Sequence, residues 1–315
     1  METAASGLKV NTRLQRKRKR RIIAPLLWMT VPVFLLGVVF NYLPIWGWSM
    51  AFVHYNPGIS VLNSEFAGLH YFYRLFEAGS SFLTAMRNTL VLALLGMLVL
   101  PGAVVFALLI AEAKARIYKK LVQIVTSFPY FVSWIIVYSI FFFFLAVDDG
   151  QINLLLLKLG LTENPVDFLG NPDYSWLLMT TANLWKGLGY TAIIFISAIS
   201  GIDQELYQAA NVDGAGRFRN IIHITLPGIM PTFAVLMILN TGQLLNLGFE
   251  QYYTFQNPMT LERLEILDTY VYRQGLTNYD FSFATAVGIF KTLVSCLLLF
   301  MANGVFKRFM NKSII

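Results

Sequence analysis

Long apolar stretches separated by polar connections dominate the hydrophobic pattern of this chain. A helix that crosses a membrane needs about 20 mostly apolar residues, and several stretches reach that length. The pattern therefore predicts an all-α, polytopic membrane protein with six transmembrane helices, over residues 22–43, 89–111, 121–145, 175–199, 229–248 and 283–305. The long connections between them are residues 44–88, 146–174, 200–228 and 249–282.

Composition supports the same class of protein. Only 13% of the 315 residues are charged and 57% are hydrophobic, whereas an ordinary soluble domain carries about 25% charged residues. The first apolar stretch is longer than the roughly 7–15 apolar residues of a signal peptide, and no small-x-small cleavage site follows it. A retained membrane span is therefore expected there.

The basic residues gather on one set of connections. Residues 1–21, 112–120 and 200–228 and the C-terminal tail together hold 17 of the 24 Lys and Arg, but only five of the 17 Asp and Glu. Cytoplasmic segments of membrane proteins are rich in Lys and Arg. These segments are therefore expected in the cytoplasm. With six spans, both termini lie on that side.

The segment YQAANVDGAGRFRNIIHITLP, residues 207–227, is a polar interruption between two apolar stretches. The preceding Asp203 can cap a short helix over QELYQAANV, and Gly214 can adopt the backbone angle that ends it. A second helix then leads into the fifth span. The small residues around Gly214 allow another backbone to approach, which favours a docking surface.

This segment resembles the "EAA" loop of ABC-importer permeases. The resemblance rests on Gln208-Ala209-Ala210, then Gly214 after three residues, then Ile224-x-Leu226-Pro227 after nine more. In that family the loop forms a coupling helix that sits in a groove of the cytoplasmic ATPase. The resemblance implies a coupling loop at residues 201–227. The residues implied to contact the ATPase are Gln208, Ala209, Ala210, Asp213, Gly214, Ala215, Gly216, Leu226 and Pro227. Gln208 stands where the family usually has glutamate, and it keeps the length of that residue but not its charge.

Residues 127–142, 242–258 and 267–291 look like the polysaccharide and complex-oligosaccharide branch of these permeases, which includes importers of pectin fragments and alginate. The resemblance implies import of oligosaccharides or polysaccharide fragments, acidic ones among the candidates, across a bacterial inner membrane. The implied partners are an ABC ATPase dimer that binds ATP and Mg, a second six-span permease and an extracytoplasmic solute-binding protein. The implied organisation is a basic tail at 1–21, a permease domain at 22–305 and a cytoplasmic tail at 306–315.

Polar and aromatic residues inside the spans are candidates for the substrate pathway, because charges there are costly and seldom without a role. Three amides recur at a spacing of three in the fifth span, which predicts one polar helix face; bonds between helices would explain them equally well. Lys186 can instead form a structural ion pair or snorkel, and Lys291 can contact substrate or a carboxylate. Two lysines in a pathway would suit an acidic saccharide. The candidates are Tyr130, Trp134, Asn183, Trp185, Lys186, Asn240, Gln243, Asn246, Glu250 and Lys291.

The sequence lacks the motifs that are typical of several other classes of function. No phosphate-binding G-x-x-x-x-G-K-[ST] loop is present, so ATP hydrolysis is expected on a separate chain. No catalytic or metal-binding motif is found, and no cofactor is expected in this chain. Arg217 and Arg219 are too few basic residues for a nucleic-acid footprint. Two alternatives remain: a stand-alone secondary transporter, and a membrane enzyme acting on lipid-linked sugars, for which only Asp148-Asp149 approaches a carboxylate cluster.

Overall fold

The computed structural model describes residues 28–77 and 80–310. Within these residues all regular elements are helices, apart from an isolated antiparallel bridge between Val53 and Phe66. The predicted all-α class is confirmed. The chain divides into two units, Met1–Gly68 and Leu69–Ile315, and each is described by itself.

The first unit contains one apolar segment long enough to cross a membrane. It comprises an α-helix over residues 28–41 and the 3₁₀ helix η1 (Leu43–Phe52), and a short 3₁₀ turn, η2 (Val61–Asn63), follows. Most of its apolar side chains are exposed, as expected of a helix surrounded by lipid. The predicted span at 22–43 falls partly on residues 22–27, which lie outside the described residues.

The second unit is a helical bundle. Its elements are α2 (His70–Arg74), α3 (Ser81–Gly96), α4 (Val99–Glu112), α5 (Arg116–Ser127), the 3₁₀ turn η3 (Phe128–Phe131), α6 (Trp134–Leu145), α7 (Gln151–Lys158), α8 (Pro172–Ser200), α9 (Gln204–Val212), α10 (Arg217–Asn220), the π-helical turn η4 (Ile221–Thr225), α11 (Leu226–Gly242), α12 (Phe249–Phe255), α13 (Leu261–Leu264), α14 (Leu267–Tyr272), the π-helical turn η5 (Arg273–Thr277) and α15 (Phe281–Met310).

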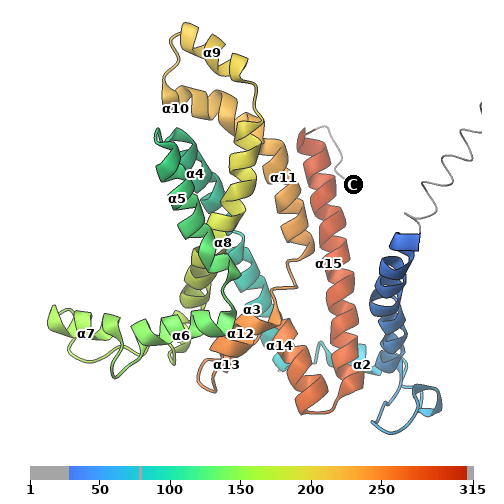
Figure 1. Ribbon diagram of the computed structural model, residues 1–315. Helices are drawn as coiled ribbons and strands as arrows, with labels where there is room; N and C mark the ends of the chain where they lie inside the picture. The colour runs from blue at the N-terminus through green and yellow to red at the C-terminus, as the bar shows by residue number, and fades with distance from the viewer. Residues whose placement is uncertain (1–27, 78–79, 311–315) are drawn as a thin grey trace, which may run out of the picture. The chain divides into compact units, whose positions relative to one another are not determined.

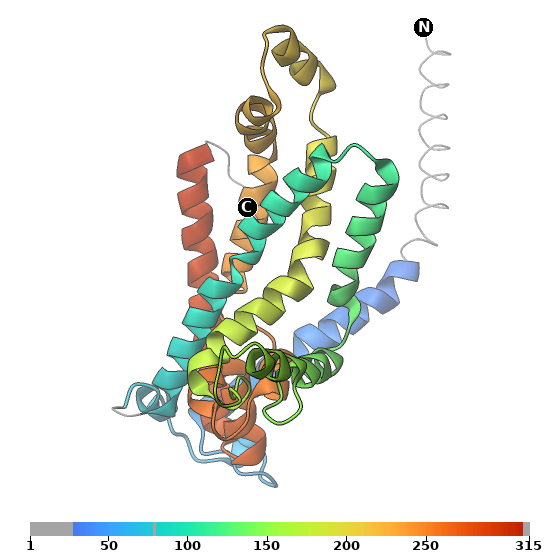
Figure 2. The same cartoon turned by 90° about the vertical axis from the view of Figure 1, so that its left-hand side faces the viewer.

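The second unit has two distinct ends (Figure 1). Helix α9 lies beyond one end of the long helices, and we call this end the α9 end. Helices α13 and α14 lie at the opposite end, which we call the α13 end. The view in Figure 2, turned by 90°, shows the same arrangement. The C-terminal part of α15 and the connection between α4 and α5 point toward the α9 end. Three of the basic segments grouped by sequence therefore lie at one end of the bundle.

The bundle is held together along α8. Leu100 and Val104 of α4 pack with Phe195 of α8 and Ile229 of α11 in a buried apolar cluster. A side chain at Gly189 would place its Cβ 2.1 Å from the carbonyl oxygen of Thr126. Because that position is glycine, the end of α5 can lie directly against α8.

The third predicted span, over residues 121–145, contains a sharp bend. Among the described residues, five helices are long and apolar enough to cross a membrane, and a sixth span arises only if the bent pair Arg116–Phe131 and Trp134–Leu145 counts as one. The two halves meet at 105°. Pro129 lies before the bend, and the side chain of Ser133 accepts a hydrogen bond from Ile136 N to cap α6. The chain therefore leaves the bundle axis between these two residues.

The boundaries of two other spans also differ from the prediction. The second span begins at Ser81 rather than at residue 89 and runs to Glu112. The helix of the fifth span ends at Gly242 rather than at residue 248. The predicted polar face in that span is therefore wrong, because Gln243 and Asn246 follow the helix instead of continuing it.

Candidate functional site

Helix α9 and the turn after it are built by local interactions. Asp203 Oδ1 accepts a hydrogen bond from Glu205 N at 2.9 Å and caps the start of α9. At the other end, Ala215 N donates to Ala210 O at 2.9 Å and Gly214 N donates to Asn211 O at 3.1 Å. Gly214 has a φ of +74°. This pairing is the Schellman turn that ends helices at a left-handed residue, so the predicted cap and stop are both confirmed.

The turn brings most of the predicted coupling residues into one exposed segment. Residues 208–216 are contiguous there, whereas Leu226 and Pro227 lie apart, in the first turn of α11. Two apolar side chains flank the turn: Val212 is 88% exposed and Phe218 is 76% exposed. Neither was among the predicted site residues. The sequence signal that could have identified them is their apolar character in an otherwise polar loop.

Two side-chain hydrogen bonds tie α9 to the helix that follows. The hydroxyls of Tyr207 and Thr225 lie 2.9 Å apart, and Asn220 Nδ2 donates to Asn211 Oδ1 at 3.1 Å. The sequence analysis missed both pairs, which no motif identifies. Since Thr225 lies in the π-helical turn that continues into α11, the bond between Tyr207 and Thr225 connects α9 to the start of that helix.

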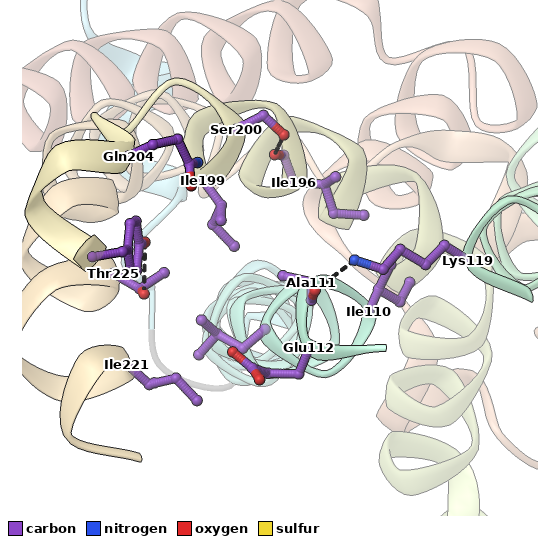
Figure 3. Close-up of a pocket in the computed structure, with 12 residues that line it drawn as sticks. Ile110, Ala111, Glu112, Lys119, Ile196, Ile199, Ser200, Gln204, Ile221 and Thr225 are labelled. Carbon is purple, nitrogen blue, oxygen red and sulfur yellow. Dashed lines mark hydrogen bonds between the residues drawn. The ribbon is translucent and has the colours of Figure 1, made fainter. Parts of the chain in front are cut away.

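A cavity of about 380 Å³ lies behind α9, between the ends of α4, α5 and α8 (Figure 3). Glu112 and Lys119 line one side of it, and Gln204 and Tyr207 line the other. Lys119 Nζ donates to Ala111 O at 2.6 Å, which fixes the connection between α4 and α5. Helix α9 therefore has open space on the side facing the bundle.

The bend between α5 and α6 is the second candidate site. Lys186 Nζ donates to the carbonyl oxygens of Pro129 at 3.2 Å and Tyr130 at 2.8 Å, and also to Val132 O. It lies 5.1 Å from the ring centroid of Trp134. A cation is favourable at carbonyls left free by a helix end. In this structure Lys186 binds backbone carbonyls rather than a carboxylate.

The bend gathers three of the ten pathway candidates, Tyr130, Trp134 and Lys186. The ring of Tyr130 also stacks on Tyr190 with centroids 3.8 Å apart. Next to this cluster, Trp185 lines an apolar cavity of about 550 Å³ formed with α6 and α7.

Among the other candidates, Glu250 lies close enough for its charge to act on Lys186, and the rest lie elsewhere. Asn240 Nδ2 donates to Leu236 O of its own helix, and Glu250 is exposed in the first turn of α12. Asn183 is half-buried on α8. Lys291 forms an ion pair with Asp268 of α14, which is one of the two roles that the sequence left open. The sequence candidates therefore belong to several separate places in the fold.

Replacing Lys186 by methionine is expected to destabilise the bend. A polar group left without its partner in apolar surroundings costs about 1–3 kcal/mol, so a loss on the order of 2–4 kcal/mol is expected for the three carbonyls together. Thermal unfolding of the detergent-solubilised protein measures this loss. Lys158→Met, at the exposed end of α7, is the matched control. Equal melting temperatures for the two variants would contradict the structural role.

Sequence comparison identifies relatives over most of the chain. Residues 100–312 match the family described as binding-protein-dependent transport system inner membrane component. Protein LplB of Bacillus subtilis (strain 168) is 42% identical over 89% of this chain and 88% of its own. The polygalacturonan/rhamnogalacturonan transport system permease protein YteP of the same organism is 40% identical over 94% of this chain and 93% of its own.

Solved structures share the fold. The crystal structure of a bacterial ABC transporter involved in the import of the acidic polysaccharide alginate matches with a TM-score of 0.83 at 35% identity, over 95% of this chain and 99% of that one. The alginate transporter crystallised with an alginate pentasaccharide-bound periplasmic protein matches with a TM-score of 0.84 at 33% identity, over 94% and 99%.

These matches decide between the functions that the sequence left open. They disfavour a stand-alone secondary transporter and a membrane enzyme acting on lipid-linked sugars, because the matching family consists of transport subunits. The chain is a membrane protein and a transport subunit rather than an enzyme. It belongs to the family of binding-protein-dependent transport system inner membrane components, the permeases of ABC importers.

Proposed function

We propose that this permease carries oligosaccharides or polysaccharide fragments, acidic ones among them, into the cytoplasm of a bacterium. Support comes from two relatives of substantial identity: one is named for polygalacturonan and rhamnogalacturonan transport, and one is described as importing the acidic polysaccharide alginate. Both substrates are chains of sugars that carry carboxylates. The class of substrate rests on these relatives, and the coupling mechanism rests on the geometry of this chain.

ATP hydrolysis on a partner ATPase dimer drives the transport, with ATP and Mg held by that partner. The observation that carries this proposal is the α9 loop, which projects beyond the bundle with Val212 and Phe218 exposed beside its turn. Closure of the ATPase pulls on residues 208–216. The bonds from Tyr207 to Thr225 and from Asn211 to Asn220 pass this displacement to α11. Helices α8 and α11 then rock and switch the side on which the pathway is open.

The α9 end is proposed to face the cytoplasm. The connection at residues 112–120, the α9 loop and the last turn of α15, with Lys307 and Arg308, carry basic residues at that end. Both termini then lie in the cytoplasm, including the tails at 1–21 and 306–315. The α13 end receives sugar from an extracytoplasmic solute-binding protein. A second six-span permease completes the pathway as a heterodimer with the permease domain at 22–305.

Co-purification tests these partners. The chain is tagged at its C-terminus, extracted gently from native membranes and analysed by mass spectrometry for associated proteins. An ATPase with a phosphate-binding loop and a second six-span chain are expected. Recovery of the tagged chain alone, from membranes that still transport the sugar, would count against the importer assembly.

A further inference from the structure

Three cationic side chains at the α13 end are neutralised by a carboxylate. Arg74 Nη1 lies 2.6 Å from Asp280, Arg273 Nε lies 2.6 Å from Glu265, and Lys291 pairs with Asp268. Glu265 raises the pKa of the Arg273 guanidinium, chiefly through this hydrogen bond. Within residues 28–77 and 80–310 these three are the ion pairs found. Arg87 and Arg263, which lie on α3 and α13, belong to none of these pairs.

Both of these arginines lie against one tryptophan. The guanidinium carbon of Arg263 is 4.9 Å from the ring centroid of Trp176, and that of Arg87 is 6.0 Å from it. The three residues come from α13, α3 and α8, which are far apart in the sequence. Attraction of each cation to the aromatic ring accounts for part of this arrangement, but it pairs neither charge with a carboxylate.

Hydrogen bonds to the backbone hold this cluster in place. Trp176 Nε1 donates to the carbonyl oxygen of Arg263 at 2.9 Å. Buried Asn88 donates through Nδ2 to Glu262 O at 2.8 Å and to Glu265 O at 3.0 Å. These bonds fix α13 to α8 and α3. The indole of Trp176 and the backbone that carries Arg263 are thus positioned by the fold.

The guanidinium groups retain unused hydrogen-bonding capacity. Arg87 donates through Nε and Nη2 to Asn88 Oδ1, and through Nη2 to Glu262 O, so Nη1 is not engaged in these bonds. Arg87 is exposed and Arg263 half-buried. The nearest carboxylate along the chain, that of Glu262, is exposed and pairs with neither arginine among the described residues. A guanidinium matches a carboxylate in a two-bond geometry.

We propose that Arg87, Arg263 and Trp176 form an outer subsite at the α13 end that binds the carboxylates of an acidic oligosaccharide. The two guanidinium groups bind carboxylates of the sugar chain, and the half-buried indole offers an apolar surface to a sugar ring. The subsite rests on the proposed function, since it lies at the end where sugar arrives. At this subsite, Arg87 and Arg263 determine the preference of the transporter for charged over neutral saccharides.

The test compares one sugar with and without its charge. The complete transporter complex is placed in lipid nanodiscs without the binding protein, and binding of trigalacturonate and of its fully methyl-esterified form is measured. Because each guanidinium can donate charge-assisted hydrogen bonds to a carboxylate, Arg263→Gln and Arg87→Gln are each expected to weaken trigalacturonate binding by roughly tenfold. The ester should be unaffected, and Arg263→Lys should keep part of the affinity.

Two matched controls separate this effect from net charge and from folding. Arg74→Gln removes a cation that also lies over a ring, 4.4 Å from the centroid of Phe283, but that is already paired with Asp280. Lys158→Gln removes an exposed cation at the end of α7. Neither should change the preference for the acid over the ester.

Three results would overturn the subsite. They are unchanged trigalacturonate binding in both arginine variants, equal weakening of acid and ester, or a defect that occurs only when the binding protein is added. The last result would mean that the arginines contact that protein. If the wild-type complex neither bound nor transported any saccharide, the proposed function itself would fail, whereas saccharide transport without an arginine effect would remove only this subsite.

Discussion

Replacing Gly214 by valine is expected to release the ATPase and abolish sugar-driven ATP hydrolysis. Gly214 has a φ of +74°, and no atom lies within 4 Å of where its Cβ would stand, so the effect comes from the backbone and not from a collision. A left-handed conformation costs a non-glycine residue roughly 1–2 kcal/mol, and a β-branched one is a marked outlier there. Relaxing that strain breaks the Schellman turn and changes the positions of the exposed Val212 and Phe218 on either side of it.

The prediction is measured as the amount of ATPase that co-purifies and as the ATPase rate stimulated by sugar-loaded binding protein. A decrease of at least about tenfold is expected, because 1.4 kcal/mol corresponds to a factor of ten. Gly214→Asn should be milder, since asparagine tolerates the left-handed region. Gly160→Val is the control: Gly160 also has a positive φ, +66°, and an open Cβ position, but it follows α7 and lies outside the coupling loop. Wild-type coupling in Gly214→Val would show that the turn geometry does not matter.

The α9 loop could be predicted in detail because its structure is determined by neighbouring residues. Asp203 caps α9 by accepting a hydrogen bond from Glu205 N, two residues downstream. The hydrogen bonds of the Schellman turn join residues no more than five positions apart. Such short-range geometry is visible in the order of residues alone. The bonds from Tyr207 to Thr225 and from Asn211 to Asn220 were missed because many pairs of polar side chains in that loop could have met.

The bend at the third span could be predicted only in part. Pro129 and Ser133 are both signals for the end of one helix and the start of another, yet a continuous apolar pattern over residues 121–145 outweighed them. What stabilises the bend lies elsewhere in the sequence: Lys186 comes from α8, more than fifty residues away, and donates to three carbonyls there. Hydropathy measures whether a segment prefers lipid, and it contains no information on such a distant partner.

The end of the helix in the fifth span also could not be predicted from the sequence. Asn240, Gln243 and Asn246 have helical spacing, but the helix ends at Gly242. A Cβ at Gly242 would come 2.6 Å from Leu299 Cδ1, so α15 packs closely against this turn. The helix end therefore coincides with a tertiary contact, and spacing along the chain could not reveal it. Identifying the partner of Lys291 needed the structure for the same reason.

Replacing Lys291 by methionine is expected to destabilise the protein by about 3–5 kcal/mol, the usual cost of removing one member of a buried ion pair. The side chains of Lys291 and Asp268 are only 12% and 20% exposed. Asp268 Oδ2 is buried and has no other hydrogen-bond partner among the described residues. Without Lys291, α14 retains a largely buried carboxylate that no cation neutralises.

The double variant Lys291→Met with Asp268→Leu separates a structural pair from substrate recognition. Because apolar residues of similar volume often replace a buried pair at little cost, the double variant should recover most of the melting temperature lost by Lys291→Met alone. Lys158→Met again serves as the exposed-lysine control and should melt like the wild type. If Lys291 instead served the sugar, Lys291→Met would melt like the wild type and lose transport, and Asp268→Leu would restore nothing. Recovery of stability in the double variant therefore assigns Lys291 to the attachment of α14 to α15, and leaves recognition of charged sugar to other cations.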